Sequence, residues 1–310
     1  MVAVKKVFID GSAGTTGLRI AERLAARADI ELLCLPEESR KDPACRRQML
    51  NEADIAFFCL PDAAAKQAAA MIENDKTVVI DTSTAHRVDP QWVYGFPELG
   101  GRRAQIAGAK RIANPGCHAS GFLALVAPLV QAGLLRREAK LCAFSLTGYS
   151  GGGKSMIAAY EAADAPALYA APRQYGLGQS HKHLPEMQQI SGLFVPPVFC
   201  PVVAPYKAGM EVTVPVFADD LNADKQQLEA FYQTYYQSGL VQVVPDASED
   251  GFLSACAFAG KDTMQITVAG NDERLLLIAR FDNLGKGACG AAIQNMNLVL
   301  GVAETTGLVL

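Results

Sequence analysis

The chain has 310 residues, half of them hydrophobic, and a formal net charge of −4. This length is enough for two domains, each with its own core. Nucleic-acid binding needs a basic patch, but here 32 acidic residues outnumber 28 basic ones and both are scattered. The composition therefore predicts no nucleic-acid partner.

Membrane insertion and secretion are also not predicted. The N-terminus leads directly into an apolar strand and lacks the hydrophobic region of a signal peptide. Residues 112–135 carry no charge, but polar residues interrupt them and Pro128 would kink a helix. Eight cysteines include no C-x-x-C pair, which favours reduced thiols and a cytoplasmic location.

The first 115 residues alternate between strand and helix patterns. Apolar strands are expected at 4–9, 30–35, 53–60 and 77–80, with helices at 18–27 and 63–73. Nearly continuous apolar strands imply burial on both faces. This pattern predicts an α/β fold with a doubly wound parallel (Rossmann) sheet.

A glycine-rich turn, GSAGTTG, follows the first strand. Its form is G-x-x-G-x-x-G, and a helix opens directly after it. Glycines let the backbone approach a pyrophosphate, and the helix start offers free N–H groups to it. The turn predicts these dinucleotide contacts: Gly11, Ser12, Gly14, Thr15, Thr16 and Gly17. A merely structural turn is the alternative.

The end of the second strand bears on which nicotinamide cofactor is used. Ser39, Arg40 and Lys41 can supply donors and positive charge to the 2′-phosphate of NADP. Glu37 and Glu38 instead suit a solvated loop, or the ribose of NAD. We expect NADP(H), with Ser39 and Arg40 among its contacts.

Cys117 lies just past this nucleotide-binding pattern, in the run NPGCH. Pro115 and Gly116 end a strand and force a turn, and the uncharged stretch beyond predicts a buried helix. The positive end of a helix dipole favours the thiolate form of a cysteine. Cys117 is therefore the predicted nucleophile for thioester chemistry.

The remainder of the chain predicts a second, mixed α+β domain. Strands are expected at 139–146, 211–217, 264–269 and 274–281, several of them antiparallel. The apolar helix at 288–300 should pack back on the nucleotide domain. The predicted domains are 1–116 completed by 286–310 for NADP, and 117–285 for catalysis, substrate and oligomerisation.

Residues 148–155, GYSGGGKS, fit the P-loop pattern G-x-x-x-x-G-K-[ST]. A P-loop domain would continue into further parallel strand–helix units, whereas prolines and glycines follow here. Consecutive glycine N–H groups can instead form an anion nest that holds a phosphate. An ATPase is therefore a weaker alternative.

Two of the four histidines stand in the run HKHLPE at 181–186. A spacing of two would place both imidazoles on one side of an extended segment. A metal site would need a third ligand, for which only Glu186 offers itself. Acid–base chemistry suits the pair better, and no metal is predicted.

Six motifs occur together in an order that resembles the N-acetyl-γ-glutamyl-phosphate reductases, in their shorter form. The motifs are GSAGTTG at 11–17, DTSTAHR at 81–87, GFPEL at 95–99, NPGC at 114–117, HKHLPE at 181–186 and DNLGKG at 282–287. The resemblance implies the fold of aspartate-semialdehyde dehydrogenase. It also implies NADPH-dependent reduction of an acyl phosphate in arginine biosynthesis.

The resemblance further implies residue roles. Cys117 would be the nucleophile and His181 the general acid/base, while Asn283 would contact the cofactor. The substrate would be surrounded by Arg87, Tyr175, His183 and Glu186. His118 and His86 depart from the commoner, longer form of the family, and His118 is a rival base beside the nucleophile.

Alternatives remain at this point. A related dehydrogenase acting on aspartyl or aminoadipyl phosphate would share the cysteine chemistry. A noncatalytic NADP-binding sensor would leave Cys117 and the paired histidines without a purpose. We expect a small-molecule acyl phosphate as the partner, and a homodimer or homotetramer.

Overall fold

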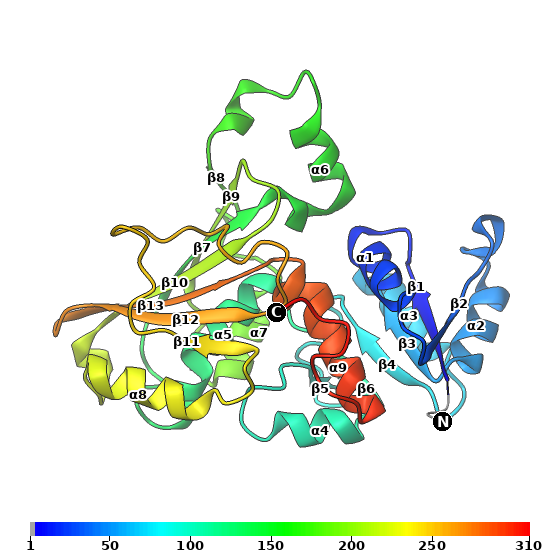
Figure 1. Ribbon diagram of the computed structural model, residues 1–310, viewed down its shortest axis with the longest axis horizontal. Coiled ribbons are helices and arrows are strands. Elements are labelled where there is room, and N and C mark those ends of the chain that lie inside the picture. Colours follow the sequence, from blue (N-terminus) through cyan, green and yellow to red (C-terminus); the bar gives the residue numbers. More distant parts are fainter. Residues whose placement is uncertain (1–3) are drawn as a thin grey trace. The chain divides into compact units, whose positions relative to one another are not determined.

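A computed structural model describes residues 4–310 of the chain (Figure 1). The chain forms two compact units, each described by itself. The first unit contains the residues up to Pro97, then Gly101–Pro115 and Ala288–Leu308. The second contains Glu98–Gly100, Gly116–Gly287 and Val309–Leu310.

The first unit is built on a six-stranded parallel sheet with strand order β2-β1-β3-β4-β6-β5. Its strands are β1 (Lys5–Asp10), β2 (Ile30–Leu33), β3 (Ile55–Phe58), β4 (Val78–Asp81), β5 (Val93–Tyr94) and β6 (Arg111–Ala113). Its α-helices are α1 (Thr15–Leu24), α2 (Pro43–Glu52), α3 (Asp62–Ala70), α4 (Arg102–Gly108) and α9 (Gly290–Leu300). Every residue of β3 and β4 is buried, as a parallel sheet covered on both faces requires.

Two hydrophobic clusters lie on the two faces of this sheet. One joins Ile9 and Phe57 to Ile20 of α1 and Ile293 of α9. The other joins alternate sheet residues, such as Phe8 and Phe58, to side chains of α2 and α3. Helices thus cover both faces, which confirms the doubly wound architecture. The C-terminal helix packs in the first cluster, as its apolar sequence predicted.

The segment after β2 is exposed to solvent, but it forms a turn and a helix, α2, that the sequence did not predict. Glu37–Ser39 form a 3₁₀ turn, and α2 follows with Pro43 at its first position. The Asp42 side chain caps α2 by accepting the backbone N–H groups of Ala44 and Cys45. Aspartate followed by proline is a recognisable start signal for a helix.

The second unit is built on a seven-stranded mixed sheet, in the order β11-β12-β13-β10-β7-β9-β8. The strands are β7 (Cys142–Gly148), β8 (Arg173–Gln174), β9 (Val198–Ala204), β10 (Met210–Phe217), β11 (Val241–Val243), β12 (Met264–Gly270) and β13 (Arg274–Phe281). Only the β7–β9 and β11–β12 pairs are parallel. This mixed sheet confirms the predicted second domain class.

One face of the mixed sheet is covered by helices. Helix α5 (Cys117–Gln131) packs against β10 and β13, and α8 (Lys225–Tyr235) packs against β11 and β12. Residues 118–129 of α5 are all buried, as its uncharged sequence predicted. The side chain of Asp224 caps α8 within a capping box. Exposed apolar residues on strands β7, β9, β10 and β13 are Phe144, Val198, Phe217 and Leu276.

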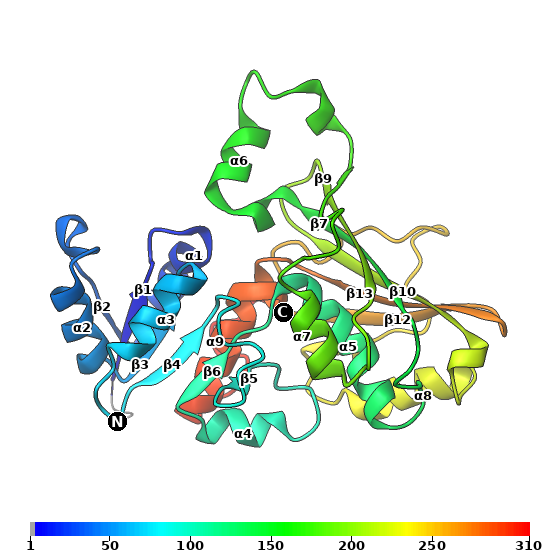
Figure 2. The same cartoon turned by 180° about the vertical axis from the view of Figure 1, so that it is seen from behind.

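The segment that fits the P-loop pattern folds differently. β7 lies between antiparallel β10 and parallel β9, and a 3₁₀ turn (Tyr149–Gly152) separates it from α6 (Gly153–Glu161). In both views, the part of the second unit that carries α6 projects beyond the ends of β7 and β9 (Figures 1 and 2). Within residues 4–310, β7 pairs in parallel with β9 but antiparallel with β10, whereas a P-loop domain would continue in an all-parallel sheet, which disfavours the P-loop alternative.

Two further elements complete the second unit and its link to α9. Helix α7 spans Leu184–Ser191, and a π-helix at Gly285–Cys289 leads into α9. No helix within residues 4–310 is long and apolar enough to cross a membrane.

Candidate active site

The glycine-rich turn after β1 is shaped by close backbone contacts. Gly11 has φ +91°, and a Cβ there would lie 2.3 Å from the carbonyl oxygen of Cys59. A Cβ on Gly17 would lie 2.5 Å from the carbonyl oxygen of Gly11. Helix α1 then begins after Gly14, with no side chain capping its first turn. Its N–H groups can therefore receive a phosphate.

A cavity of about 480 Å³ lies beside this turn, within the first unit. Its lining includes Gly11 and Ser12 from the turn, and Arg40 and Lys41 from beyond β2. Ser39, predicted to contact the cofactor, is not part of the lining. The volume and the mixture of apolar and basic groups suit a nucleotide.

Arg46 is a further basic residue of this cavity that sequence reasoning missed. Its Nη2 atom lies 2.7 Å from Oδ2 of Asp10; the Asp10 side chain is buried and that of Arg46 is 11% exposed. The two residues are 36 positions apart, on β1 and α2, and no local pattern pairs them. Because Asp10 compensates the charge of Arg46, Arg40 and Lys41 carry the cavity's excess positive charge.

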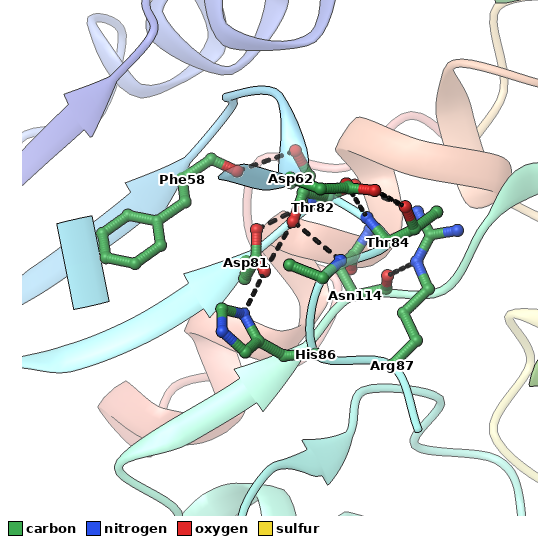
Figure 3. Close-up of polar contacts among 10 residues, drawn as sticks. Phe58, Asp62, Asp81, Thr82, Thr84, His86, Arg87 and Asn114 are labelled. Atoms are coloured by element: carbon green, nitrogen blue, oxygen red, sulfur yellow. Dashed lines mark hydrogen bonds and ion pairs between the residues drawn. The ribbon is translucent and has the colours of Figure 1, made fainter. Parts of the chain in front are cut away.

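The loop after β4 holds Arg87 by its guanidinium group (Figure 3). The Nε group donates to the Asn114 carbonyl oxygen, and Nη2 donates to the Thr82 carbonyl oxygen, each at 3.0 Å. His86 shares the loop, where Asp81 Oδ2 lies 2.6 Å from its Nδ1 atom and the Trp92 ring stacks on it. Both residues therefore shape the loop, whatever Arg87 also binds.

In the second unit, Cys117 is the first residue of α5, and Gly116 is its N-cap, with no side-chain cap. The backbone N–H of Gly116 donates to Oε2 of Glu186 at 3.2 Å. A Cβ on Gly287 would lie 3.0 Å from Cβ of Cys117, so residue 287 has little room for any side chain larger than the hydrogen of glycine. The turn that carries Cys117, the predicted nucleophile, is thus held from two distant parts of the sequence.

The paired histidines do not lie in an extended segment, contrary to our expectation. His183 is in the turn that leads into α7, with Pro185 in the first helical turn. The rings of His181 and His183 meet edge to face, with centroids 4.7 Å apart. The backbone N–H of His183 donates to Nδ1 of His181 at 3.2 Å, so neutral His181 carries its proton on Nε2.

His118 joins the same cluster from α5. Its ring centroid lies 5.8 Å from that of His181, and its Nε2 atom lies 2.7 Å from the hydroxyl of Tyr175. Burial, and then the charges of His181 and Lys182, lower the pKa of His118 to about 3. A weak base with both ring nitrogens engaged is poorly suited to accept the substrate's proton.

Glu186 and Asn283 are more deeply embedded than the other predicted site residues. Glu186 is 1% exposed, and its Oε1 atom lies 3.9 Å from Nε2 of His183. Asn283 donates to Ser150 Oγ and accepts the Gly209 N–H, each at 3.0 Å. These contacts give both side chains a structural part in the second unit.

A buried ion pair was missed by the sequence reasoning. Nζ of Lys286 lies 2.7 Å from Oε1 of Glu98, and each side chain is 2% exposed. Both residues belong to motifs noted above, but 188 positions separate them. Among residues 4–310, no group of three or more His, Cys, Asp or Glu side chains could hold a metal ion.

Comparison with known proteins identifies the family. Residues 6–109 match the semialdehyde dehydrogenase NAD-binding domain, and residues 117–283 match the semialdehyde dehydrogenase dimerisation domain. The chain is 44% identical to N-acetyl-gamma-glutamyl-phosphate reductase 2 of a Nostoc species, over 98% of this chain and 99% of that protein. It is 47% identical to N-acetyl-gamma-glutamyl-phosphate reductase of Burkholderia lata, over 96% and 97%.

The chain belongs to the N-acetyl-γ-glutamyl-phosphate reductase family. The resemblance inferred from the motifs is thereby confirmed. As a member of this family, the protein is an oxidoreductase with a nicotinamide-binding domain.

Solved structures show that this reductase family member has the aspartate semialdehyde dehydrogenase fold. The Vibrio cholerae aspartate semialdehyde dehydrogenase II complexed with ASA has a TM-score of 0.73 at 20% identity, covering 96% of this chain and 98% of that one. The Candida albicans aspartate semialdehyde dehydrogenase with NADP gives 0.66 at 15% identity, covering 96% and 99%. The predicted fold is confirmed.

Proposed function

We propose that this protein reduces N-acetyl-L-glutamyl 5-phosphate to N-acetyl-L-glutamate 5-semialdehyde, in arginine biosynthesis, through a thioester on Cys117. The observation that carries the proposal is a cysteine at an uncapped helix N-terminus beside a histidine cluster, in a member of this family. The Cys117 thiolate attacks the acyl carbon, and the carbon–oxygen bond to phosphate breaks. Phosphate leaves and the thioester remains.

The N–H groups in the first turn of α5 support the oxyanion that forms in this attack, because no side chain caps them. A reduced nicotinamide, which the glycine-rich turn and the adjoining cavity would hold, would be the source of the hydride that reduces the thioester carbon. The resulting tetrahedral oxyanion takes a proton from His181. Its collapse releases the aldehyde, returns the thiolate to Cys117 and gives the proton back to His181.

Substrate recognition is assigned to four polar residues that the family resemblance implies. Arg87 would engage the substrate carboxylate through its guanidinium group. Tyr175, His183 and Glu186 complete the set that the family resemblance implies. The contacts of Glu186 with Gly116 and His183 favour a role in holding the nucleophile's turn as well.

NADP(H) is the proposed cofactor. The close-packed glycines of the turn and the adjacent cavity of about 480 Å³ fit a dinucleotide. Arg40 and Lys41 line that cavity, and their positive charge would pair with the 2′-phosphate. Glu37 also lines it, which would disfavour that phosphate, but the two basic groups outweigh its single charge.

The reaction is tested in the oxidative direction with N-acetylglutamate semialdehyde, phosphate and NADP, beside aspartate semialdehyde. Cys117→Ser should abolish turnover while cofactor affinity is kept, and Cys256→Ser is the control thiol in the same unit. Faster turnover of aspartate semialdehyde would contradict the proposed substrate. Turnover by Cys117→Ser would contradict the thioester.

Cofactor choice is tested with a double substitution, Arg40→Ala/Lys41→Ala. It should lower the ratio of kcat/KM for NADPH over NADH by roughly 10-fold or more, because phosphate ion pairs are lost. Lys66→Ala, a basic residue on α3 that is not part of the cavity lining, is the control. An unchanged ratio would contradict the assignment of NADP to these residues.

We also propose a homodimer, formed through the open face of the mixed sheet, with a tetramer as the larger alternative. Phe144, Val198 and Phe217 are 44%, 57% and 65% exposed on neighbouring strands, within the matched dimerisation domain. An apolar face of this kind marks an interaction surface. In analytical ultracentrifugation, Val198→Glu should lower the sedimentation coefficient to that of a monomer. Leu168→Glu, in the part of the second unit that carries α6, should leave it unchanged.

The catalytic thiol requires a reducing compartment, and we propose the cytoplasm.

A further inference from the structure

The histidine cluster contains a chain of three polar side chains, of which the family assignments use only Tyr175. Ser145 Oγ lies 2.7 Å from Nδ1 of His118, and Nε2 of His118 lies 2.7 Å from the Tyr175 hydroxyl. Ser145 comes from β7, His118 from α5, and Tyr175 follows β8. All three belong to the second unit.

The direction of these two hydrogen bonds is coupled. Neutral imidazole has one N–H, so one ring nitrogen donates and the other accepts. Because burial keeps His118 neutral, with its pKa lowered to about 3, only two arrangements are possible. In the first, Ser145 donates to Nδ1 and Nε2–H donates to Tyr175. In the second, Tyr175 donates to Nε2 and Nδ1–H donates to Ser145.

Burial of Ser145 selects between the two arrangements. Ser145 is 0% exposed, and His118 is the one hydrogen-bond partner of its hydroxyl within residues 4–310. In the second arrangement, the Ser145 proton would therefore be buried without an acceptor, which is costly. Tyr175 is only half-buried, so its own proton can reach water or another group when His118 does not accept it.

We propose that Ser145 fixes His118 as its Nε2–H tautomer, so that the Tyr175 hydroxyl keeps its proton to donate to the reacting oxygen at Cys117. His118 is then a positioning residue, one position along α5 from the nucleophile, and it acts through Tyr175. Tyr175 holds this proton at neutral pH, since burial and then the charge of Cys117 raise the pKa of Tyr175. The kinetic part of the inference builds on the proposed reductase function.

The tautomer is tested by ¹⁵N NMR on histidine-labelled protein at pH 7, which needs no enzymatic activity. The chain has four histidines, and His118→Gln identifies the His118 signals by their loss. We expect a protonated Nε2 and an unprotonated Nδ1 in the wild type. A protonated Nδ1, or averaging between both tautomers, would overturn the proposal, even if the protein is an active reductase.

The kinetic consequence is tested by a double-mutant cycle. Ser145→Ala and Tyr175→Phe should each lower kcat, with roughly 100- to 1,000-fold expected where a donor to an oxyanion is lost outright, as in Tyr175→Phe. The double variant should be no slower than Tyr175→Phe, because both changes remove the same proton donor. If the fold loss in kcat of the double variant equalled the product of the two single losses, the two residues would act independently, which would contradict the proposal.

Two controls separate positioning from folding. Ser191→Ala removes another buried serine hydroxyl, which donates to the Gln188 carbonyl, and should leave kcat unchanged. His118→Gln keeps a donor in the place of Nε2–H and should retain more activity than His118→Asn. The reverse order would contradict the proposed direction of the bond. If the wild type lacked reductase activity, the proposed function would fail, while the NMR result would still decide the tautomer.

Discussion

Glu186 accepts the backbone N–H of Gly116, a residue 70 positions earlier, and so ties α7 to the turn that presents Cys117. The carboxylate is 1% exposed, and its other oxygen faces His183. One buried side chain therefore connects the predicted nucleophile's turn with the histidine segment.

Glu186→Ala should lower both stability and turnover. It leaves a buried N–H without its acceptor, and hydrogen bonds to charged groups contribute about 1.5–3 kcal/mol. We expect a loss of this size in urea unfolding, and a fall in kcat larger than any change in KM. Glu186→Gln keeps an oxygen acceptor and should lose less stability and less turnover than Glu186→Ala. Glu273→Ala, at an exposed position, should change neither stability nor turnover. Equal losses in the Gln and Ala variants would contradict this role.

Gly287→Ala should impair catalysis more than folding. The added methyl carbon would lie 3.0 Å from both Cβ of Cys117 and the Asp282 carbonyl oxygen, so Cys117 must shift. Displacements well below 1 Å are felt in catalysis, and we expect kcat to fall about 10-fold. Gly108→Ala is the control, because nothing lies within 4 Å of a Cβ there. Normal kcat in Gly287→Ala would show that the contact does not position the thiol.

The buried Lys286–Glu98 pair should be sensitive to loss of one partner. Lys286→Met leaves the Glu98 charge in a site where both side chains are 2% exposed, at a cost of about 3–5 kcal/mol. Lys286→Met/Glu98→Leu should recover part of that loss in denaturant unfolding. Lys207→Met, which breaks an exposed pair with Glu161, should cost at most about 1 kcal/mol. A double variant less stable than Lys286→Met would contradict this reasoning.

His118 makes stability depend on pH. Its folded pKa, about 3, lies below the unfolded value of 6.5, so between these values only the unfolded chain binds the proton. The free energy of unfolding should therefore fall as pH is lowered through this range, by at most about 1.4 kcal/mol per unit. Denaturant unfolding at pH 7, 6 and 5 should show a shallower slope for His118→Gln. Identical slopes would mean that His118 titrates normally.

Local patterns were sufficient for strands β1 to β4 of the first sheet, for the glycine turn before α1 and for the helix that begins at Cys117, whereas the short strand β5 was not predicted. Each of these depends on neighbouring residues, such as Pro115 and Gly116 before α5. Helix α2 was missed because only Leu50 of its ten residues is buried, which leaves little apolar periodicity. Its signal was the Asp42 cap followed by proline.

Long-range partners could not be predicted from one sequence. Asp10–Arg46 and Ser145–His118 join residues 36 and 27 positions apart, and only the fold brings each pair together. The paired histidines were expected in an extended segment because their spacing of two suggested it. Proline near the start of α7 instead placed His183 in a turn.

The helices differ in whether a side chain caps their first turn, and this affects the stability of the protein. Aspartates cap α2 and α8, whereas α1 and α5 begin at Gly14 and Gly116 with no side-chain cap. A cap contributes about 1 kcal/mol, and under the proposed function a ligand would occupy each of these two uncapped helix ends instead. Ligands that bind only the folded form stabilise it by mass action. In a cell short of cofactor and substrate, this protein would unfold more often and be degraded sooner, so its abundance would follow the supply of the molecules it consumes.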